Sequence, residues 1–272
     1  MGEAIVVTGG TGTLGRKLVP LLAGIGHDIR TIGRGATGLD GHRHSQGDLL
    51  ADGPWITKAV AGASTIIHCA GAAKGDGAIA ANMVRAAVDA SVSRIVHLSV
   101  VGVGRIPTTG FLNRVMFNYF AEKTAAEVAV QRSGMDWAIL RSTQFNELLL
   151  KVVQALSHMP VVPVPQGFKF QPIAAAEVAA LVAGIVRDRV TGIMEIGGPQ
   201  VVTFNELVST YERAVRLRKV HIPIWLPGTG AAAFRKGANL CTSSRSGGIG
   251  WASYVNRLYP PTGAATVERT IR

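Results

Sequence analysis

The feature that most restricts the fold is a glycine-rich turn directly after a short apolar segment near the N-terminus. Residues 4–8 read Ala-Ile-Val-Val-Thr, and residues 9–15 read Gly-Gly-Thr-Gly-Thr-Leu-Gly before an apolar helical pattern begins. Glycines let a ligand approach the backbone, and a helix N-terminus offers unpaired N–H groups. A plain tight turn is the alternative, but strand, turn and helix in this order predict a dinucleotide-binding loop. The expected contacts are Gly9, Thr11, Gly12, Thr13, Leu14 and Gly15.

Apolar runs alternate with segments of helical periodicity through the first 140 residues or so. Such alternation predicts right-handed βαβ crossovers and a parallel sheet covered on both faces, which is a Rossmann-type doubly wound α/β fold. The expected strands are residues 4–8, 28–32, 42–46, 65–69, 94–99 and 136–141, and the expected helices are 14–23, one from 54, 79–90 and 117–132.

The end of the second expected strand points to the kind of dinucleotide. NAD-selective sheets usually carry an acidic residue there, whereas this chain has Arg34. A guanidinium can bind a 2′-phosphate through a charge-assisted fork, which favours NADP, with NAD still possible; an ordinary surface arginine is the alternative. Arg16 could assist from the helix start. Asp48, with Leu49 beside it, follows the third strand and is expected near the adenine amino group, although an exposed helix-start aspartate is nearly as plausible.

A tyrosine and a lysine four residues apart, Tyr119 and Lys123, fall within the expected helix 117–132. They therefore project from one helix face. An ammonium group near a phenol is expected to lower the tyrosine pKa and make it a usable acid or base. On an arbitrary helix this spacing would indicate a surface pair, but here it follows the fifth strand of a nucleotide-binding sheet and predicts proton transfer.

The sequence resembles the short-chain dehydrogenase/reductase superfamily and its atypical NmrA-like branch. The motifs are residues 8–15, 68–72 (His-Cys-Ala-Gly-Ala), Leu98-Ser99, Tyr119 with Lys123, and the phrases at 133–141, 171–173 and 197–199. The resemblance implies Tyr119 as acid/base and Lys123 on the nicotinamide ribose. The same resemblance implies Gly9, Gly12 and Gly15 at the pyrophosphate, and Ala70 and Gly71 near the adenosine. It also implies a substrate-binding Ser or Thr after the fifth strand. Ser99 stands one or two residues early, and Thr108 or Thr109 could substitute.

Beyond Arg141 the pattern is looser, and the C-terminal part is expected to be a smaller substrate lobe. Helices are predicted at 144–157, 177–187, 204–216 and 249–257, strands at 193–196 and 220–224, and extended turns at 159–172. Thr203 and Glu206 predict a capping box. Because no polar linker separates the parts, we expect residues 1–150 to form the NAD(P)-binding domain and 151–272 a lobe partly interleaved with the sheet.

Composition excludes several classes of function. The formal net charge is +11, but no nucleic-acid-binding motif accompanies it, so we expect no nucleic-acid partner. No apolar run is long enough to span a membrane. The cysteines, Cys69 and Cys241, lie far apart, and no histidine spacing suggests a metal, so no metal is expected and a reducing cytoplasm is the simplest location. A monomer or homodimer is expected.

Together these features predict an NADP(H)-dependent oxidoreductase that reduces a small carbonyl or quinone-type substrate. Tyr119 would be the acid/base, supported by Lys123, with Ser99 as the third catalytic candidate. Two other functions stay open: a non-catalytic NADP(H) redox sensor of the NmrA type, and a sugar-nucleotide epimerase or dehydratase. The substrate itself is not predicted.

Overall fold

Short, buried apolar segments form one parallel sheet of seven strands, in the order β3-β2-β1-β4-β5-β6-β9. The computed structural model describes residues 2–39, 41–72, 74–243 and 248–260. The strands are β1 (Ala4–Thr8), β2 (Asp28–Gly33), β3 (Arg43–Gln46), β4 (Thr65–His68), β5 (Arg94–Val100), β6 (Asp136–Ser142) and β9 (Gly192–Ile196). The predicted Rossmann-type fold is confirmed. The strand order reverses between β1 and β4, where such sheets bind ligands at their carboxyl ends.

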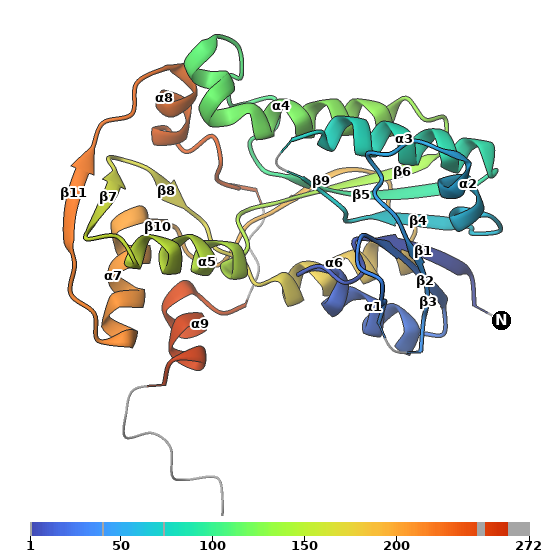
Figure 1. Ribbon diagram of the computed structural model, residues 1–272, viewed down its shortest axis with the longest axis horizontal. Helices are drawn as coiled ribbons and strands as arrows, with labels where there is room; N and C mark the ends of the chain where they lie inside the picture. Colours follow the sequence, from blue (N-terminus) through green and yellow to red (C-terminus); the bar gives the residue numbers. More distant parts are fainter. Residues whose placement is uncertain (1, 40, 73, 244–247, 261–272) are drawn as a thin grey trace, which may run out of the picture.

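Helices cover both faces of this sheet (Figure 1). Helices α1 (Gly15–Gly24) and α6 (Ala175–Arg187) share one core with one face of the sheet. The other face is covered by α2 (Pro54–Val60), α3 (Asp76–Asp89) and α4 (Phe111–Gln131). The sheet is therefore buried on both sides, as its apolar strands require.

The C-terminal part of the chain contributes both to the sheet and to a second cluster of helices and strands beside it. Helix α6 and strand β9 return to the Rossmann sheet. The remaining elements surround two further apolar cores beside it (Figure 1). These elements are α5 (Asn146–Ser157), β7 (Val161–Pro165), β8 (Lys169–Phe170), β10 (Val202–Thr203), α7 (Phe204–Val215), β11 (Val220–Ile224), α8 (Thr229–Arg235) and α9 (Trp251–Leu258).

Some local elements of this part were not predicted as such. The segment 159–172, expected to form extended turns, contains two short strands, β7 and β8, because β7 pairs in parallel with β11 and β8 pairs with β10. Helix α8 forms within a glycine-rich stretch for which no helix was predicted, and Phe234 anchors it in an aromatic cluster. The capping box of Thr203 and Glu206 at the start of α7 is confirmed.

Helix α4 begins six residues earlier than expected, at Phe111 instead of Phe117. Its backbone is distorted at Phe117 (φ −127°, ψ 15°), just before Tyr119. The Phe117 ring packs against Phe234 of α8 with ring centres 5.8 Å apart. The first turns of α4 therefore belong to the second cluster, and its later turns cover the sheet.

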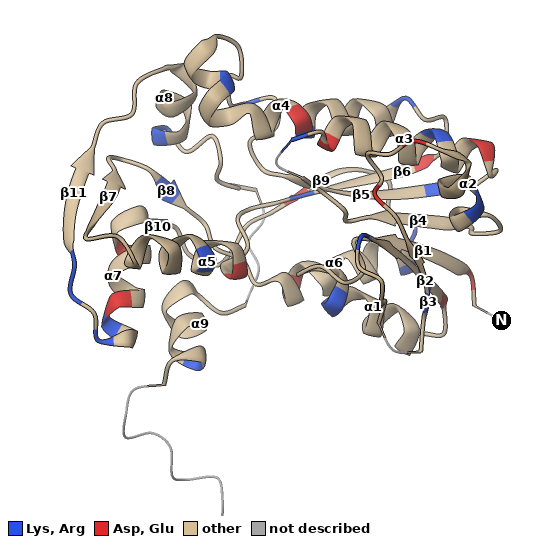
Figure 2. Cartoon of the chain, viewed as in Figure 1, with Lys and Arg blue, Asp and Glu red and all other residues tan. Residues whose placement is uncertain are grey.

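Charged residues are distributed over both parts of the chain (Figure 2). The densest basic stretch, residues 213–219, lies at the C-terminal end of α7 and in the connection to β11, and the helix dipole favours cations at such an end. Within the described residues, no helix is both long and apolar enough to cross a membrane.

Candidate functional site

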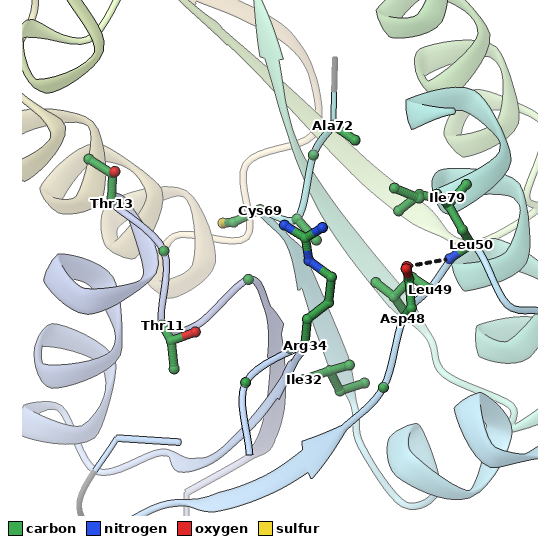
Figure 3. Close-up of a pocket in the computed structure, with 17 residues that line it drawn as sticks. Thr11, Thr13, Ile32, Arg34, Asp48, Leu49, Leu50, Cys69, Ala72 and Ile79 are labelled. Carbon is green, nitrogen blue, oxygen red and sulfur yellow. Dashed lines mark hydrogen bonds between the residues drawn. The ribbon is translucent and has the colours of Figure 1, made fainter. Parts of the chain in front are cut away.

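The glycine-rich turn borders a cavity of about 440 Å³ at the carboxyl ends of β1, β2 and β4. Figure 3 shows its lining residues, which come from the turn, from the ends of β2 and β4, and from the segment after β3. Of the residues predicted to hold the cofactor, those that line the cavity are Gly9, Thr11, Gly12, Thr13, Arg34, Asp48, Leu49, Ala70 and Gly71. Those that sequence reasoning missed are Ile32, Gly33, Gly35, Gly47, Leu50, Cys69, Ala72 and Ile79.

Two further residues predicted to contact the cofactor, Leu14 and Gly15, do not line this cavity. Leu14 is buried in the core with the apolar face of α1. A Cβ at Gly15 would lie 2.4 Å from the carbonyl oxygens of Gly9 and Gly10. Gly15 therefore lets the helix pack closely beneath the turn, and its place in the motif is explained by packing.

The turn is held by its own backbone. Gly9 has φ +67°, which glycine adopts without strain, and a Cβ there would lie 2.9 Å from the Ala70 nitrogen. The Gly12 N–H donates to the Gly9 carbonyl at 2.8 Å. Arg16, expected to assist with a phosphate, donates its Nε–H to the Thr11 carbonyl at 2.7 Å. Arg16 thus stabilises the turn in the structure.

Arg34 extends into the cavity between the turn and Asp48 (Figure 3). Its side chain is exposed and makes no ion pair with any described residue. Asp48 accepts a hydrogen bond from the Leu50 N–H at 3.0 Å, so one carboxylate oxygen shapes the local turn. The cavity therefore presents the Arg34 guanidinium, with no ion pair to a described residue, together with the Asp48 carboxylate.

Lys123 lies beside the cavity and is held on two sides. It is buried, with its Nζ 3.0 Å from the Asp76 carboxylate, and it donates to the Leu98 carbonyl at 3.2 Å. A Cβ at Gly71, which lines the cavity, would lie 3.5 Å from this Nζ. The Nζ is also 5.9 Å from the centre of the Tyr119 ring. The predicted tyrosine and lysine are thus adjacent, but Asp76 is a third member that sequence reasoning missed.

The predicted direction of the Tyr119 pKa was wrong. Desolvation of the phenol raises the pKa of Tyr119 above its ordinary value, although 39% of the residue is exposed. Lys123 acts to lower this pKa, whereas the buried Asp76 carboxylate acts to raise it. Because desolvation and Asp76 together outweigh the effect of Lys123, the pKa of Tyr119 lies above its ordinary value and the phenol is protonated at neutral pH.

Ser99 does not point to substrate as predicted. Its hydroxyl is buried and lies 2.5 Å from Glu127 Oε1 of α4, to which it donates. Strand alternation turns this side chain toward α4, where Arg141 also forms two hydrogen bonds with Glu127, at 2.9 and 2.6 Å. Thr108 is half-buried and Thr109 exposed, both in the segment before α4. The Ser99 hydroxyl therefore links β5 to α4.

Breaking this buried group should cost much of the protein's stability. We expect Glu127→Ala to lower the free energy of unfolding by about 3 kcal/mol, because it leaves Arg141 and Ser99 without their shared acceptor. Urea denaturation measures the change. The matched control is Asp52→Asn, which removes the exposed ion pair with Arg85 and should leave stability within about 0.5 kcal/mol. Equal effects of the two substitutions would contradict the prediction.

Two buried histidines lie on adjacent strands next to Lys123. The rings of His68 and His97 are stacked with centres 5.3 Å apart, and His68 Nδ1 is 2.9 Å from the Thr8 hydroxyl. Burial lowers the pKa of His68 to about 4 and that of His97 well below its usual value. Both are therefore neutral in the folded protein at physiological pH.

Acid should therefore destabilise the fold before carboxylates titrate. The pKa of His68 falls from 6.5 to about 4 on folding, so the neutral form is favoured in the folded state. The contribution of neutral His68 to the free energy of unfolding is complete above pH 6.5. About 3 kcal/mol of that free energy is lost as the pH falls toward 4. Urea unfolding at pH 7 and 4.5 should show a smaller decrease for His68→Gln than for the parent. Identical decreases would refute this assignment.

Comparison with known families and structures agrees with the fold and the cavity. A family model described as NAD(P)H-binding matches residues 9–189. No curated protein sequence matches the chain. An NADPH-dependent quinone oxidoreductase from Escherichia coli, solved with NADPH, is similar with a TM-score of 0.76 and 18% identity, over 94% of this chain and 99% of that one.

Two further solved structures represent different chemistries on this fold. A triphenylmethane reductase from Citrobacter, solved with NADP(H), has a TM-score of 0.66 and 20% identity, over 88% of this chain and 92% of that one. A UDP-N-acetylglucosamine 4-epimerase from Bacillus cereus has a TM-score of 0.63 and 16% identity, over 95% of this chain and 96% of that one. At these identities the similarity shows the fold alone.

Proposed function

Because the chain belongs to the NAD(P)H-binding family, we propose that it is an NADP(H)-dependent oxidoreductase that reduces a small carbonyl or quinone-type substrate. The observation that carries this proposal is the position of Tyr119 and Lys123 beside a dinucleotide cavity that Arg34 also lines. The C-terminal lobe, residues 151–272, would supply the substrate-binding surface.

The residues of the cavity suit an NADP molecule by chemistry. Gly9, Thr11, Gly12 and Thr13 would face the pyrophosphate from the start of α1, where N–H groups are available. Arg34 would bind the 2′-phosphate, and Asp48 with Leu49 would lie at the adenine. Ala70 and Gly71 would pass close to the adenosine. The bound NADPH would supply a hydride to the substrate carbon.

Tyr119 would then donate its proton to the substrate oxygen as negative charge develops there. Its raised pKa keeps the phenol protonated at neutral pH, as a proton donor requires. The Lys123 ammonium, held by Asp76 and Leu98, would stabilise the phenolate that remains. Because Tyr119 is partly exposed, solvent can return the proton. Thr108 or Thr109 is proposed to bind the substrate oxygen in place of Ser99.

A non-catalytic NADP(H) sensor is the second candidate. Two observations favour this function. The Ser99 hydroxyl is bonded to Glu127 instead of being available to a substrate, and Lys123 is paired with Asp76. Such a protein would bind NADP and NADPH with different affinities and would turn over no substrate. An epimerase, the third possibility, would retain its dinucleotide through purification.

The deciding experiment is NADPH oxidation, followed by absorbance, across a panel of small aldehydes, ketones and quinones. Steady turnover of a panel member that disappears in Tyr119→Phe supports the reductase. Turnover that is unchanged in this variant overturns the role of Tyr119. Different affinities for NADP and NADPH with no turnover support the sensor, and dinucleotide that copurifies in stoichiometric amount supports the epimerase.

A further inference from the structure

The segment that carries Arg34 is held by strand β3 through three consecutive backbone carbonyls. The Gly33 carbonyl accepts from the Gly47 N–H at 2.9 Å, and the Arg34 carbonyl accepts from Gln46 Nε2 at 3.2 Å. The Gly35 carbonyl accepts from His44 Nε2 at 2.9 Å. Every carbonyl from Gly33 to Gly35 is thus bound by a residue of β3 or the residue after it.

The side chain of His44 is itself held in place by a hydrogen bond with β2. Its Nδ1 lies 2.8 Å from the hydroxyl of Thr31, which is almost completely buried on β2. A carbonyl oxygen can only accept, so Nε2 carries the hydrogen that binds Gly35. In the neutral ring, Nδ1 then accepts the hydroxyl proton of Thr31. The imidazole bridges the body of β2 and the loop that follows it.

The loop also packs closely around this ring. A Cβ at Gly33 would lie 3.4 Å from His44 Cε1, and a Cβ at Gly38 would lie 2.6 Å from His44 Cβ. A Cβ at Gly33 would make an ordinary van der Waals contact, whereas Gly38 leaves no room for a side chain. The loop from 33 to 38 is therefore shaped around the His44 side chain.

These bonds leave the other side of the segment available to an anion. In a trans peptide the N–H points opposite to the preceding carbonyl, so the N–H groups of Arg34 and Gly35 point away from the groups that bind the Gly33 and Arg34 carbonyls. Neither N–H donates to an acceptor within the described part of the chain. Both residues line the cavity, and Arg34 extends into it (Figure 3).

We propose that His44 and Gln46 are positioning residues that set the affinity for a phosphate monoester on Arg34 and the adjacent N–H groups. The proposal rests on the proposed function, in which that phosphate is the 2′-phosphate of NADP. Successive N–H groups facing one side form an anion-binding concavity, and a fixed backbone lowers the ordering cost of binding. His44 and Gln46 confer selectivity without contacting the phosphate.

The test is fluorescence titration of the full-length protein with NADPH and NADH, which differ by this phosphate. His44→Ala is expected to weaken NADPH binding about 10-fold and Gln46→Ala about 3-fold, as for the loss of one hydrogen bond. NADH binding should stay within about twofold in both variants, which also shows that they fold. His44→Gln, whose amide can still donate, should recover part of the NADPH affinity.

A double-mutant cycle tells positioning from an independent effect. In an Arg34→Ala background, His44→Ala should weaken NADPH binding by less than twofold, because the group it positions is gone. Equal loss of NADPH and NADH affinity in His44→Ala and Gln46→Ala would indicate general damage and overturn the proposal. Retention of the parent's preference for NADPH over NADH in both variants would also overturn the proposal.

The two levels of failure are distinct. If the parent binds NADPH and NADH equally, the NADP assignment fails and this inference fails with it. If the parent prefers NADPH, and Arg34→Ala removes that preference while His44→Ala and Gln46→Ala keep it, only the positioning role is overturned. Gln46 is exposed, so its substitution gives an answer even if His44→Ala does not fold.

Discussion

Arg34→Asp is expected to reverse the cofactor preference of this protein. The guanidinium faces the cavity without an acidic partner among the described residues, so its full charge is available to a 2′-phosphate. Loss of a charge-assisted fork removes about 3 kcal/mol, or about 100-fold in affinity, and the new carboxylate adds repulsion. The dissociation constant for NADPH should therefore rise at least about 100-fold, while that for NADH changes by less than about threefold.

Isothermal titration with both dinucleotides measures this reversal. Lys151→Asp is the matched control, because it makes the same change in net charge at an exposed position of α5. It should leave both affinities unchanged at moderate ionic strength, since distant exposed charges are screened. If Lys151→Asp weakens NADPH binding as much as Arg34→Asp does, the effect belongs to the overall charge of +11 and not to Arg34.

Tyr119→Phe is expected to lower kcat about 100- to 10,000-fold with any substrate that the parent reduces. General acid catalysis contributes a factor of this size, and phenylalanine keeps the ring but removes the proton. Dinucleotide affinity should remain within about twofold, because the hydroxyl is assigned to the substrate oxygen. Tyr254→Phe, a half-buried tyrosine of α9, is the control and should keep full activity. A kcat within about threefold of the parent would refute proton donation by Tyr119.

The pH profile tests the same role independently. A proton donor is active below its pKa, and the pKa of Tyr119 is raised, so reductase activity should be level through neutral pH and fall only in strong alkali. Asp76→Asn removes the carboxylate that opposes Lys123. The pKa of Tyr119 should then decrease, and the alkaline fall in kcat should move to lower pH. A shift in the opposite direction would exclude Asp76 as a group that tunes Tyr119.

The cofactor site could be predicted well because its signals are local. The turn from Gly9 to Gly15 needs glycine for reasons that hold within a few residues: a positive φ, a close backbone approach and a helix start. Arg34 follows its strand directly, so alternating strands and helices were enough to place it at the carboxyl edge of the sheet. Most of the residues predicted to bind the cofactor consequently line one cavity.

The chemical environment of the predicted groups depended on contacts between distant segments. The sequence identified Ser99 and Tyr119 because suitable residue types stand at suitable positions. In the structure, however, Glu127 accepts the hydrogen bond of the Ser99 hydroxyl, and Asp76 compensates the charge of the Lys123 ammonium beside Tyr119. Asp76 is 47 residues from Lys123 in the sequence, and no spacing rule connects them. The pKa of a group depends on its desolvation and on all charges around it. The predicted direction of the Tyr119 pKa shift was therefore wrong.

Periodicity and the glycine turn were sufficient to predict the parallel sheet, the edge of the sheet at which the cavity lies, and the position of the glycine-rich loop. The reason is that backbone geometry and burial repeat along each helix and strand. The hydrogen bonds and charges around that loop and around the proposed proton-transfer pair, Tyr119 and Lys123, depended on the tertiary structure instead. His44 reaches the Arg34 segment, and Asp76 reaches Lys123, only after parallel strands and their helices bring them together. Hydrogen bonds and ion pairs depend on distances in space, and sequence spacing does not encode these between separate elements.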